Sequence, residues 1–129
     1  RYVGKFVAVI AFNPDLSRKI YSGADLFLMP SKSEPCGLSQ MIASRYGAVP
    51  IVRETGGLYD SIKPVGNGGN GYTFANYNAY DMLYVIREAL NDYNNREEWQ
   101  KLGKRVMSVD FSWSRSAKEY EKMYGEMLR

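Results

Sequence analysis

Short apolar runs alternate with amphipathic stretches over most of the chain. Residues 26–29, 49–52 and 72–75 are apolar runs of strand length, and residues 5–12 are a fourth, dominated by Phe, Val and Ile without clean alternation. A run of that kind is typical of a parallel strand that is covered on both faces. Because helix signals separate the runs, the pattern predicts strand-helix-strand units of an α/β fold.

Residues that start and stop helices mark the first two of these units. Asn13 followed by Pro14 predicts a helix start, and Gly23 predicts the end of that helix. A second helix is predicted over residues 38–46 and is closed by Gly47. Each helix would join one predicted strand to the next.

The last third of the chain is predicted to be helical. Asn78 with Asp81 is a capping pair, and Ser112 can cap a final helix at about residues 112–128. An aromatic stripe at helical spacing usually belongs to the core, so we expect the stripe of the final helix to be buried. The alternative is that part of the stripe is exposed because the domain that covers it is missing. Three helices are expected here, and each has one apolar face. In chain order these faces are formed by Met82, Ile86, Ala89 and Tyr93; by Trp99, Leu102 and Val106; and by Trp113, Ala117, Tyr120 and Tyr124.

The stretch Pro-Ser-Lys-Ser-Glu-Pro-Cys-Gly-Leu-Ser-Gln, residues 30–40, joins a predicted strand to a predicted helix. Gly37 lets the backbone approach a ligand closely, and the helix start that follows has unpaired N–H groups that suit an anion. With the Glu34 carboxylate, this turn can hold a sugar hydroxyl on one side and a phosphate on the other. The alternative is that Glu34 is a solvated loop acid and Cys36 a small buried hydrophobic residue.

Two further stretches are rich in glycine. Thr55, Gly56 and Gly57 form a turn that enters a short helix. Residues 64–71 are predicted to be a mobile surface loop, because Gly and Asn lose much entropy when ordered and offer little to bury. A phosphate-binding role for this loop is the alternative.

Composition narrows the range of functions. The chain has 129 residues, 45% hydrophobic and 24% charged, which predicts a single domain with one core. Its 17 basic and 14 acidic residues give a net charge of +3, and no basic block concentrates that charge as a nucleic-acid site would. We therefore expect no nucleic-acid partner.

The numbers of cysteine and histidine residues narrow the range of functions further. One cysteine cannot form an internal disulfide, there is no signal peptide, and the longest apolar run is far short of a membrane span, so a cytoplasmic protein without a membrane partner is expected. Histidine is absent from the sequence, which removes the commonest general base and the commonest zinc ligand. Chemistry must use carboxylates, backbone amides or groups outside the chain, and we expect no metal and no cofactor.

Residues 30–40, together with Arg-Glu-Thr-Gly-Gly-Leu at 53–58, closely resemble the C-terminal domain of bacterial glycogen synthases and plant starch synthases. These are retaining glucosyltransferases with two Rossmann-like domains, the GT-B type. The resemblance covers the whole chain, from Tyr2 to Trp113 and beyond. It implies that residues 1–129 are an incomplete nucleotide-sugar-binding domain, a three-layer sandwich of about four parallel strands with helices on both faces.

The family transfers glucose from ADP-glucose to the non-reducing end of an α-1,4-glucan with retention of configuration. By resemblance, Glu34 is the catalytic acid near the donor glucose, where it favours the positive charge that develops on the ring. Phe12 matches a position whose ring stacks on adenine, although a core role for Phe12 is the alternative. The other donor-binding positions that the resemblance implies are Cys36, Gly37 and Leu38 through backbone N–H groups, Ser39 through its hydroxyl, and Thr55, Gly56 and Gly57 through their turn.

The sequence departs from the wider family in ways that matter. Several related retaining enzymes carry a second acid eight residues after the first. This chain has Ile42 at that position, and bacterial glycogen synthases also lack the second acid. The Lys-Gly-Gly motif and the histidine of the N-terminal domain are missing, as are two strands that bring an Arg and a Lys to the diphosphate. The chain is expected to need that N-terminal domain as a partner and to be inactive alone.

A stand-alone nucleotide- or glucan-binding module without turnover is the alternative, and the reading frame upstream of Arg1 distinguishes the two. The choice between ADP- and UDP-glucose stays open.

The strand order 3-2-1-4-5-6 that the resemblance implies leaves a gap in this chain. Residues 5–12 would be strand 3, and the two absent strands would lie between it and residues 26–29. We expect one of two repairs: residues 5–12 pair directly with residues 26–29, or a second copy of the chain fills the gap in a homodimer. The first is slightly favoured because it keeps a right-handed crossover.

Overall fold

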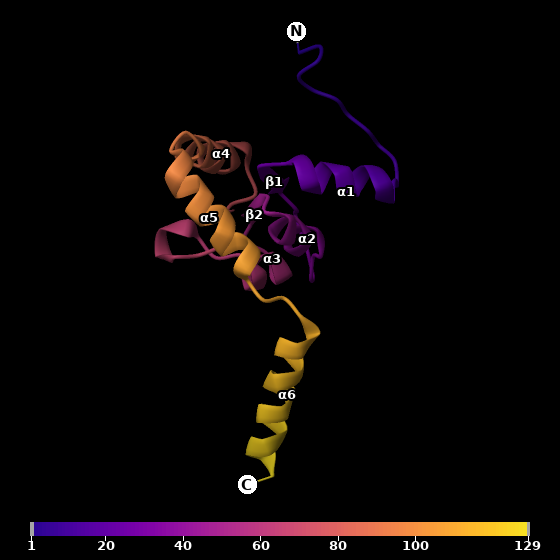
Figure 1. Ribbon diagram of the computed structural model, residues 1–129, viewed down its shortest axis with the longest axis vertical. Helices are drawn as coiled ribbons and strands as arrows, with labels where there is room; N and C mark the ends of the chain where they lie inside the picture. Colours follow the sequence, from indigo (N-terminus) through magenta and orange to yellow (C-terminus); the bar gives the residue numbers. More distant parts are fainter. Residues whose placement is uncertain (1, 129) are drawn as a thin grey trace.

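Strands and helices alternate along the body of the molecule. The computed structural model describes residues 2–128 and is shown in Figure 1. In chain order its elements are α1 (Pro14–Gly23), β1 (Leu26–Met29), α2 (Ser39–Tyr46), β2 (Val49–Arg53), α3 (Gly56–Ser61), a 3-10 turn at Val65–Asn67, β3 (Tyr72–Phe74), α4 (Ala79–Tyr93), α5 (Arg96–Ser108) and α6 (Trp113–Met127).

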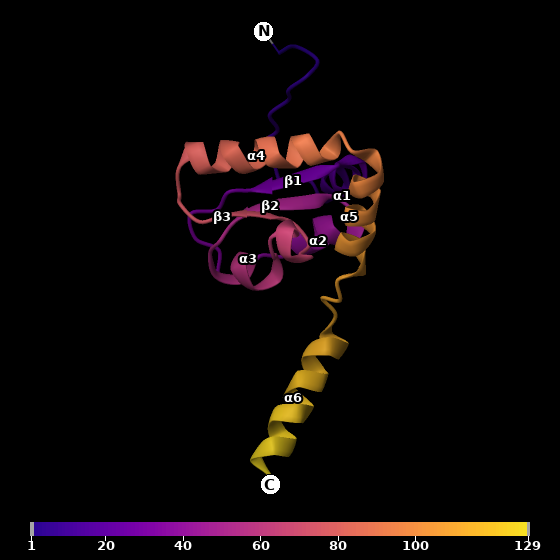
Figure 2. The ribbon, with the colours of Figure 1, turned by 90° about the vertical axis from the view of Figure 1, so that its left-hand side faces the viewer.

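The sheet of residues 2–128 has three parallel strands in the order β1-β2-β3. Leu26 pairs with Val49 and Ile51 pairs with Tyr72, so the strands end near one another at their carboxyl ends. Figure 2 shows α4 on one face of the sheet and α2 and α3 on the other. The predicted α/β three-layer arrangement is confirmed.

The central strand β2 is buried on both faces because helices cover it on both sides. Val49 and Ile51 face one core and Val52 faces the other, as expected for residues that alternate along a strand. The larger core comprises Val49, Ile51, Tyr72, Phe74, Val85, Ala89, Leu102 and Val106, and the smaller one comprises Val52, Leu58 and Ile62. Burying one such side chain stabilises the fold by roughly 1.5–3 kcal/mol.

Capping residues begin and end the helices largely as predicted. Asn13 Oδ1 accepts the Leu16 N–H at 3.0 Å, and Asn78 Oδ1 accepts the Asp81 N–H at 2.9 Å. Gly47 ends α2 with a φ of 88°, a conformation that favours glycine. Helix α6 begins after Ser112, as predicted, but the hydroxyl of Ser112 makes no cap bond with any described residue. None of the helices within residues 2–128 is long and apolar enough to cross a membrane.

The prediction of a strand at residues 5–12 is wrong. This segment is irregular and exposed, and Figure 1 shows it leaving the body ahead of α1. A parallel strand needs a hydrogen-bonded neighbour, and within residues 2–128 β1 pairs only with β2. The sheet therefore has three strands where about four were expected, and the favoured repair, direct pairing with residues 26–29, does not occur. The repair through a second copy stays a prediction.

The prediction that the aromatic stripe of α6 belongs to the core is also wrong. Trp113, Tyr120 and Tyr124 are 89%, 59% and 56% exposed. Figures 1 and 2 both show α6 extending away from the layered body. Its apolar face has no cover from the described residues, so the alternative of an exposed stripe is the one that the structure shows.

The loop at residues 64–71 is more buried than its composition suggested. Asn70 is only 5% exposed; its Oδ1 accepts the Lys63 N–H at 2.8 Å, and its Nδ2 donates to the Ser61 carbonyl at 3.0 Å. Arg105 Nε donates to the Gly69 carbonyl at 2.8 Å. The expectation that this loop offers little to bury is wrong at Asn70, while its mobility stays a prediction.

Candidate functional site

The loops that follow the three strands meet at the carboxyl edge of the sheet. In open parallel sheets this edge is where ligands bind. The loop after β1 is the stretch at residues 30–38, the loop after β2 leads directly into α3, and the loop after β3 leads to α4. The first two of these loops contain most of the predicted site residues.

The two glycine-containing turns are in direct contact. The Gly57 N–H donates to the Glu34 carbonyl at 3.1 Å and to the Pro35 carbonyl at 3.2 Å. A Cβ on Gly56 would collide with the Glu34 carbonyl, and one on Gly57 would collide with the Cys36 carbonyl. Only glycine permits this approach. The glycines at positions 56 and 57 therefore have a steric reason, which is the contact with a stretch about twenty residues earlier in the sequence.

The start of α2 presents unpaired backbone donors. Gly37 is buried with a φ of 73°, and Leu38 precedes the helix without a side-chain cap bond. The N–H groups of Leu38 and Ser39 have no acceptor among residues 2–128. A helix start with free N–H groups is electropositive and suits an anion such as a phosphate.

Arg53 ties the three loops together. Its Nη1 donates to the Lys32 carbonyl at 2.7 Å and to the Ser31 carbonyl at 3.4 Å, and its Nε donates to the Ala75 carbonyl at 3.2 Å. Its guanidinium carbon also lies 5.5 Å from the centre of the Tyr77 ring, within cation–π range. The side chain therefore joins the loop after β1 to the loop after β3 across the end of β2.

The predicted site residues fall into two groups. Glu34, Gly37, Ser39, Thr55 and Gly57 are buried or half-buried, while Cys36, Leu38 and Gly56 are exposed within the same two turns. The structure brings these eight residues to one edge of the sheet. The alternative that Cys36 is a buried hydrophobic residue is wrong, because its side chain is exposed.

Phe12 lies outside this group. It is 95% exposed and belongs to the extended segment before α1. No hydrogen bond of the described residues links it to the turns. The alternative that Phe12 is a core residue is wrong, and its stacking role stays a prediction.

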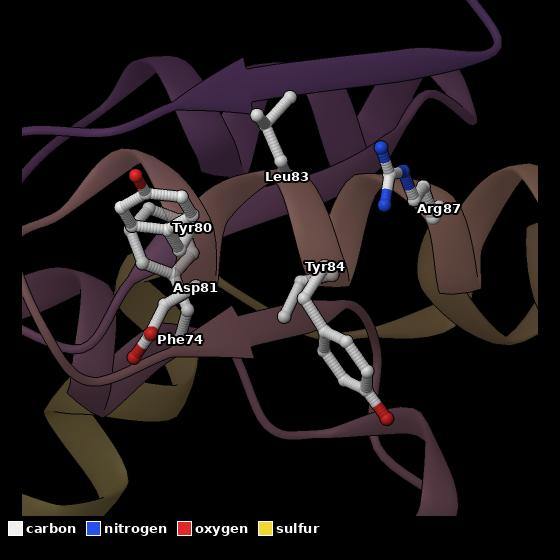
Figure 3. A pocket seen from close by; sticks show the side chains of 7 residues that line it. Phe74, Tyr80, Asp81, Leu83, Tyr84 and Arg87 are labelled. Atoms are coloured by element: carbon white, nitrogen blue, oxygen red, sulfur yellow. The ribbon is translucent and has the colours of Figure 1, made fainter.

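The surface of the described residues has a hollow beside the two turns and another on α4. A groove of about 940 Å³ runs between the turns, the loop at 64–71 and the start of α6; of the predicted residues it includes Cys36, Leu38 and Gly57, but not Glu34. A second hollow of about 700 Å³ lies on α4, where Figure 3 shows Leu83 and Tyr84 pointing in different directions from the helix. This second hollow is lined by Phe74, Tyr80, Asp81, Leu83, Tyr84, Val85 and Arg87, and contains no predicted site residue.

Reasoning from the sequence did not assign roles to Arg53, Gln40 or Ser61. Each makes a side-chain hydrogen bond to a residue about twenty positions away, as with Gln40 and Ser61 at 3.0 Å. The available signal was the position of Gln40, a polar residue at the start of a helix directly after a glycine turn. That signal does not identify its partner.

Comparison with known proteins places these features in context. The family model described as "Glycosyl transferases group 1" matches residues 3–106. The chain is 52% identical to the glycogen synthase of Geobacillus thermodenitrificans over 131 aligned positions, covering 99% of this chain and 27% of that protein. It is also 52% identical to the glycogen synthase of Clostridium acetobutylicum and 48% identical to that of Bacillus subtilis, covering 28% and 26% of those proteins.

A solved structure supports the same likeness. The catalytic domain of starch synthase IV from Arabidopsis thaliana, bound to ADP and acarbose, superposes with a TM-score of 0.83 at 42% identity. The match covers 92% of this chain and 25% of that one. The chain thus spans about a quarter of the length of the relatives that it matches.

Proposed function

Because this chain belongs to the group 1 glycosyl transferases, we propose that residues 1–129 are the incomplete C-terminal nucleotide-sugar-binding domain of a glycogen synthase. The whole enzyme transfers glucose from ADP-glucose to the non-reducing end of an α-1,4-glucan with retention of configuration. Relatives that are about half identical support this function, as does the solved relative with ADP and acarbose bound.

One observation carries the proposal: the contact between the two glycine turns at the carboxyl edge of the sheet. It holds the turn that contains the half-buried Glu34 and the free N–H groups of Leu38 and Ser39 against the turn at residues 55–57. A carboxylate and an electropositive helix start within one turn suit the two parts of a nucleotide sugar, a glucose and a diphosphate.

Each group has a distinct role in this proposal. The Glu34 carboxylate accepts hydrogen bonds from the donor glucose and favours the positive charge that develops on the ring in the transition state. The N–H groups of Cys36, Gly37 and Leu38, with the Ser39 hydroxyl, bind sugar and phosphate. The turn of Thr55, Gly56 and Gly57 forms the adjacent wall, because its glycines allow the close approach that the carbonyls of Glu34 and Cys36 require.

The rest of the donor site needs groups from outside these residues. Phe12 stacks on adenine once the two preceding strands order residues 5–12, and the N-terminal domain covers the apolar face of α6. The chain alone is inactive in this proposal, because the cationic groups for the diphosphate are not part of it. A cytoplasmic location goes with this function and with a single, unpaired cysteine.

Replacement of Glu34 tests the function. In the full-length protein encoded by the reading frame that contains this chain, Glu34→Ala should lower kcat for transfer from ADP-glucose to glycogen by about 10²–10³-fold, because the carboxylate acts on charge formed only in the transition state. The dissociation constant for ADP should change by less than about threefold, since ADP lacks the glucose that Glu34 contacts. Radiolabelled glucose incorporation and calorimetry measure the two quantities.

The control is Asp15→Ala, which removes an exposed carboxylate from α1. It should leave both quantities unchanged. A Glu34→Ala enzyme that keeps kcat within about threefold of the parent would remove Glu34 from the reaction.

A further inference from the structure

Gln40 has an environment unlike that of any other polar residue in the stretch at residues 30–40. It is the second residue of α2 and is completely buried. Its Nε2 donates to the carbonyls of Gly37 at 2.8 Å and Cys36 at 3.3 Å, and to the Ser61 Oγ at 3.0 Å. Burying a carboxamide is costly unless it is hydrogen-bonded, so these bonds explain how a glutamine is accommodated there.

The orientation of the carboxamide follows from these partners. With the amide reversed, Oε1 would face two carbonyl oxygens, which cannot donate. As it stands, Oε1 has no partner among residues 2–128 and lies against Gly37, where an added Cβ would be only 2.6 Å away. The donor side of Gln40 is therefore used fully, at the cost of an unpaired acceptor.

The side-chain hydrogen bonds of Gln40 belong to a closed ring of hydrogen bonds. The Ser61 Oγ, which accepts from Gln40, donates to the Gly57 carbonyl at 2.6 Å. The Gly57 N–H then donates to the carbonyls of Glu34 and Pro35 at 3.1 and 3.2 Å. The ring starts at the turn, passes through α2 and α3, and returns to the turn at Glu34.

We propose that Gln40 is a positioning residue that holds the Glu34 turn against the Gly57 turn, with Ser61 as its relay. This inference rests on the proposed function, because it assigns Gln40 to the geometry of the donor site. A side chain that must meet developing charge loses much of its effect when it shifts by as little as 1 Å, roughly 10²-fold in rate. Gln40 touches neither sugar nor phosphate and acts through the backbone of the turn.

Ser44 provides a matched comparison. Like Ser61 it donates its hydroxyl to the carbonyl four residues earlier, here that of Gln40 at 2.8 Å, and it is completely buried. It lies outside the ring. Loss of the Ser44 hydroxyl therefore reproduces the loss of a buried serine bond without opening the connection between the two turns.

The test uses the full-length protein with Gln40→Met, Ser61→Ala, Ser44→Ala and the double variant Gln40→Met/Ser61→Ala. Methionine keeps the length of glutamine and removes its donors. We expect Gln40→Met to lower kcat for glucose transfer from ADP-glucose about 10–100-fold, with the KM for ADP-glucose changed less than about threefold. Ser61→Ala should lower kcat by a smaller factor than Gln40→Met does. The double variant should be no slower than Gln40→Met, because both substitutions break the same ring of hydrogen bonds. Ser44→Ala should keep the parent kcat.

A second measurement separates this inference from the proposed function. Hydrogen exchange of the Gly57 amide should be at least about tenfold faster in Gln40→Met than in the parent and unchanged in Ser44→Ala. If the parent enzyme transfers no glucose, the proposed function fails and exchange alone decides the role of Gln40. If Gln40→Met does not fold, Ser61→Ala decides by the same readouts. The inference is overturned by parent-like kcat and exchange in Gln40→Met, or by equal losses in Ser44→Ala.

Discussion

The same residue types are buried in the body of the molecule and exposed at its ends. Val49 and Ile51 in β2 are at most 2% exposed, whereas Val7 is 80% exposed and Ile10 fully so in the segment before α1. Tyr72 is 7% exposed in β3, and Tyr124 is 56% exposed in α6. The difference does not lie in hydrophobicity. It lies in whether other described residues supply a neighbouring surface, as they do for β2 and do not for residues 5–12 or α6.

This contrast separates two kinds of information in an apolar pattern. Spacing indicates which face of an element is to be buried, but the partner that buries it is set by tertiary structure. Where residues 2–128 supply the partner, either nearby in sequence as β1 does for β2 or far away as α5 does, the element forms and packs. The ends have the pattern without the partner.

The largest effect should come from matched truncations of isoleucine in the two regions. Ile51→Ala should lower the free energy of unfolding of the 129-residue chain by about 2–5 kcal/mol, because it leaves a cavity in the larger core. Ile10→Ala should change it by less than about 0.5 kcal/mol, because the side chain is already in water. Urea titrations measure both. Equal losses would mean that residues 5–12 pack as a strand after all.

Alanine in place of glycine should have opposite effects in the two regions. At Gly57 the new Cβ meets the Cys36 carbonyl, so Gly57→Ala should destabilise the body by about 1–3 kcal/mol. At Gly125 nothing lies within 4 Å of the new Cβ, and alanine should stabilise α6 by about 0.5–1 kcal/mol. Urea midpoints report the first change and far-UV circular dichroism the second. A shifted urea midpoint for Gly125→Ala would show that α6 packs on the body.

The smallest effect concerns a tyrosine hydroxyl and depends on pH. Burial, together with a 2.7 Å hydrogen bond to Asp92, raises the pKa of Tyr72 well above its ordinary value. The folded protein thus keeps this proton when the unfolded chain has lost it, so the contribution to stability is present below about pH 10 and is lost as pH rises further.

Tyr72→Phe should remove that alkaline loss and cost about 0.5–1.5 kcal/mol at pH 7. Tyr124→Phe in α6 should change the free energy of unfolding by less than about 0.5 kcal/mol at either pH. Urea titrations at pH 7 and pH 11 give all four values. An alkaline loss that persists in Tyr72→Phe would contradict the assignment.

Local signals predicted most of the body. The three strands of the sheet lie within one residue of their predicted bounds, because each is a short apolar run between a helix end and a turn. The caps at Asn13 and Asn78 were also predictable, since a capping side chain bonds to a residue three positions away. The resemblance of residues 30–40 to a known family motif indicated the position of the candidate site.

The interior of the site was not predictable, because its contacts join distant residues. The bonds from Arg53 to Lys32 and from Gln40 to Ser61 span 21 residues each. Nothing in the spacing of polar residues shows that a glutamine in α2 will reach a serine in α3. The failed strand at residues 5–12 has the converse cause, since its pattern is that of a strand but none of residues 2–128 pairs with it.

Helix α6 remains attached to α5 through residues 109–112 alone. Its fifteen residues give it a reach of roughly 22 Å at 1.5 Å per residue. Any surface held on the same polypeptide meets its apolar stripe as an intramolecular event, at an effective concentration of about a millimolar or more for so short a tether. Weak intrinsic affinity is then enough to keep the stripe covered, so the length of residues 109–112, as much as the aromatic side chains, sets how firmly α6 is held.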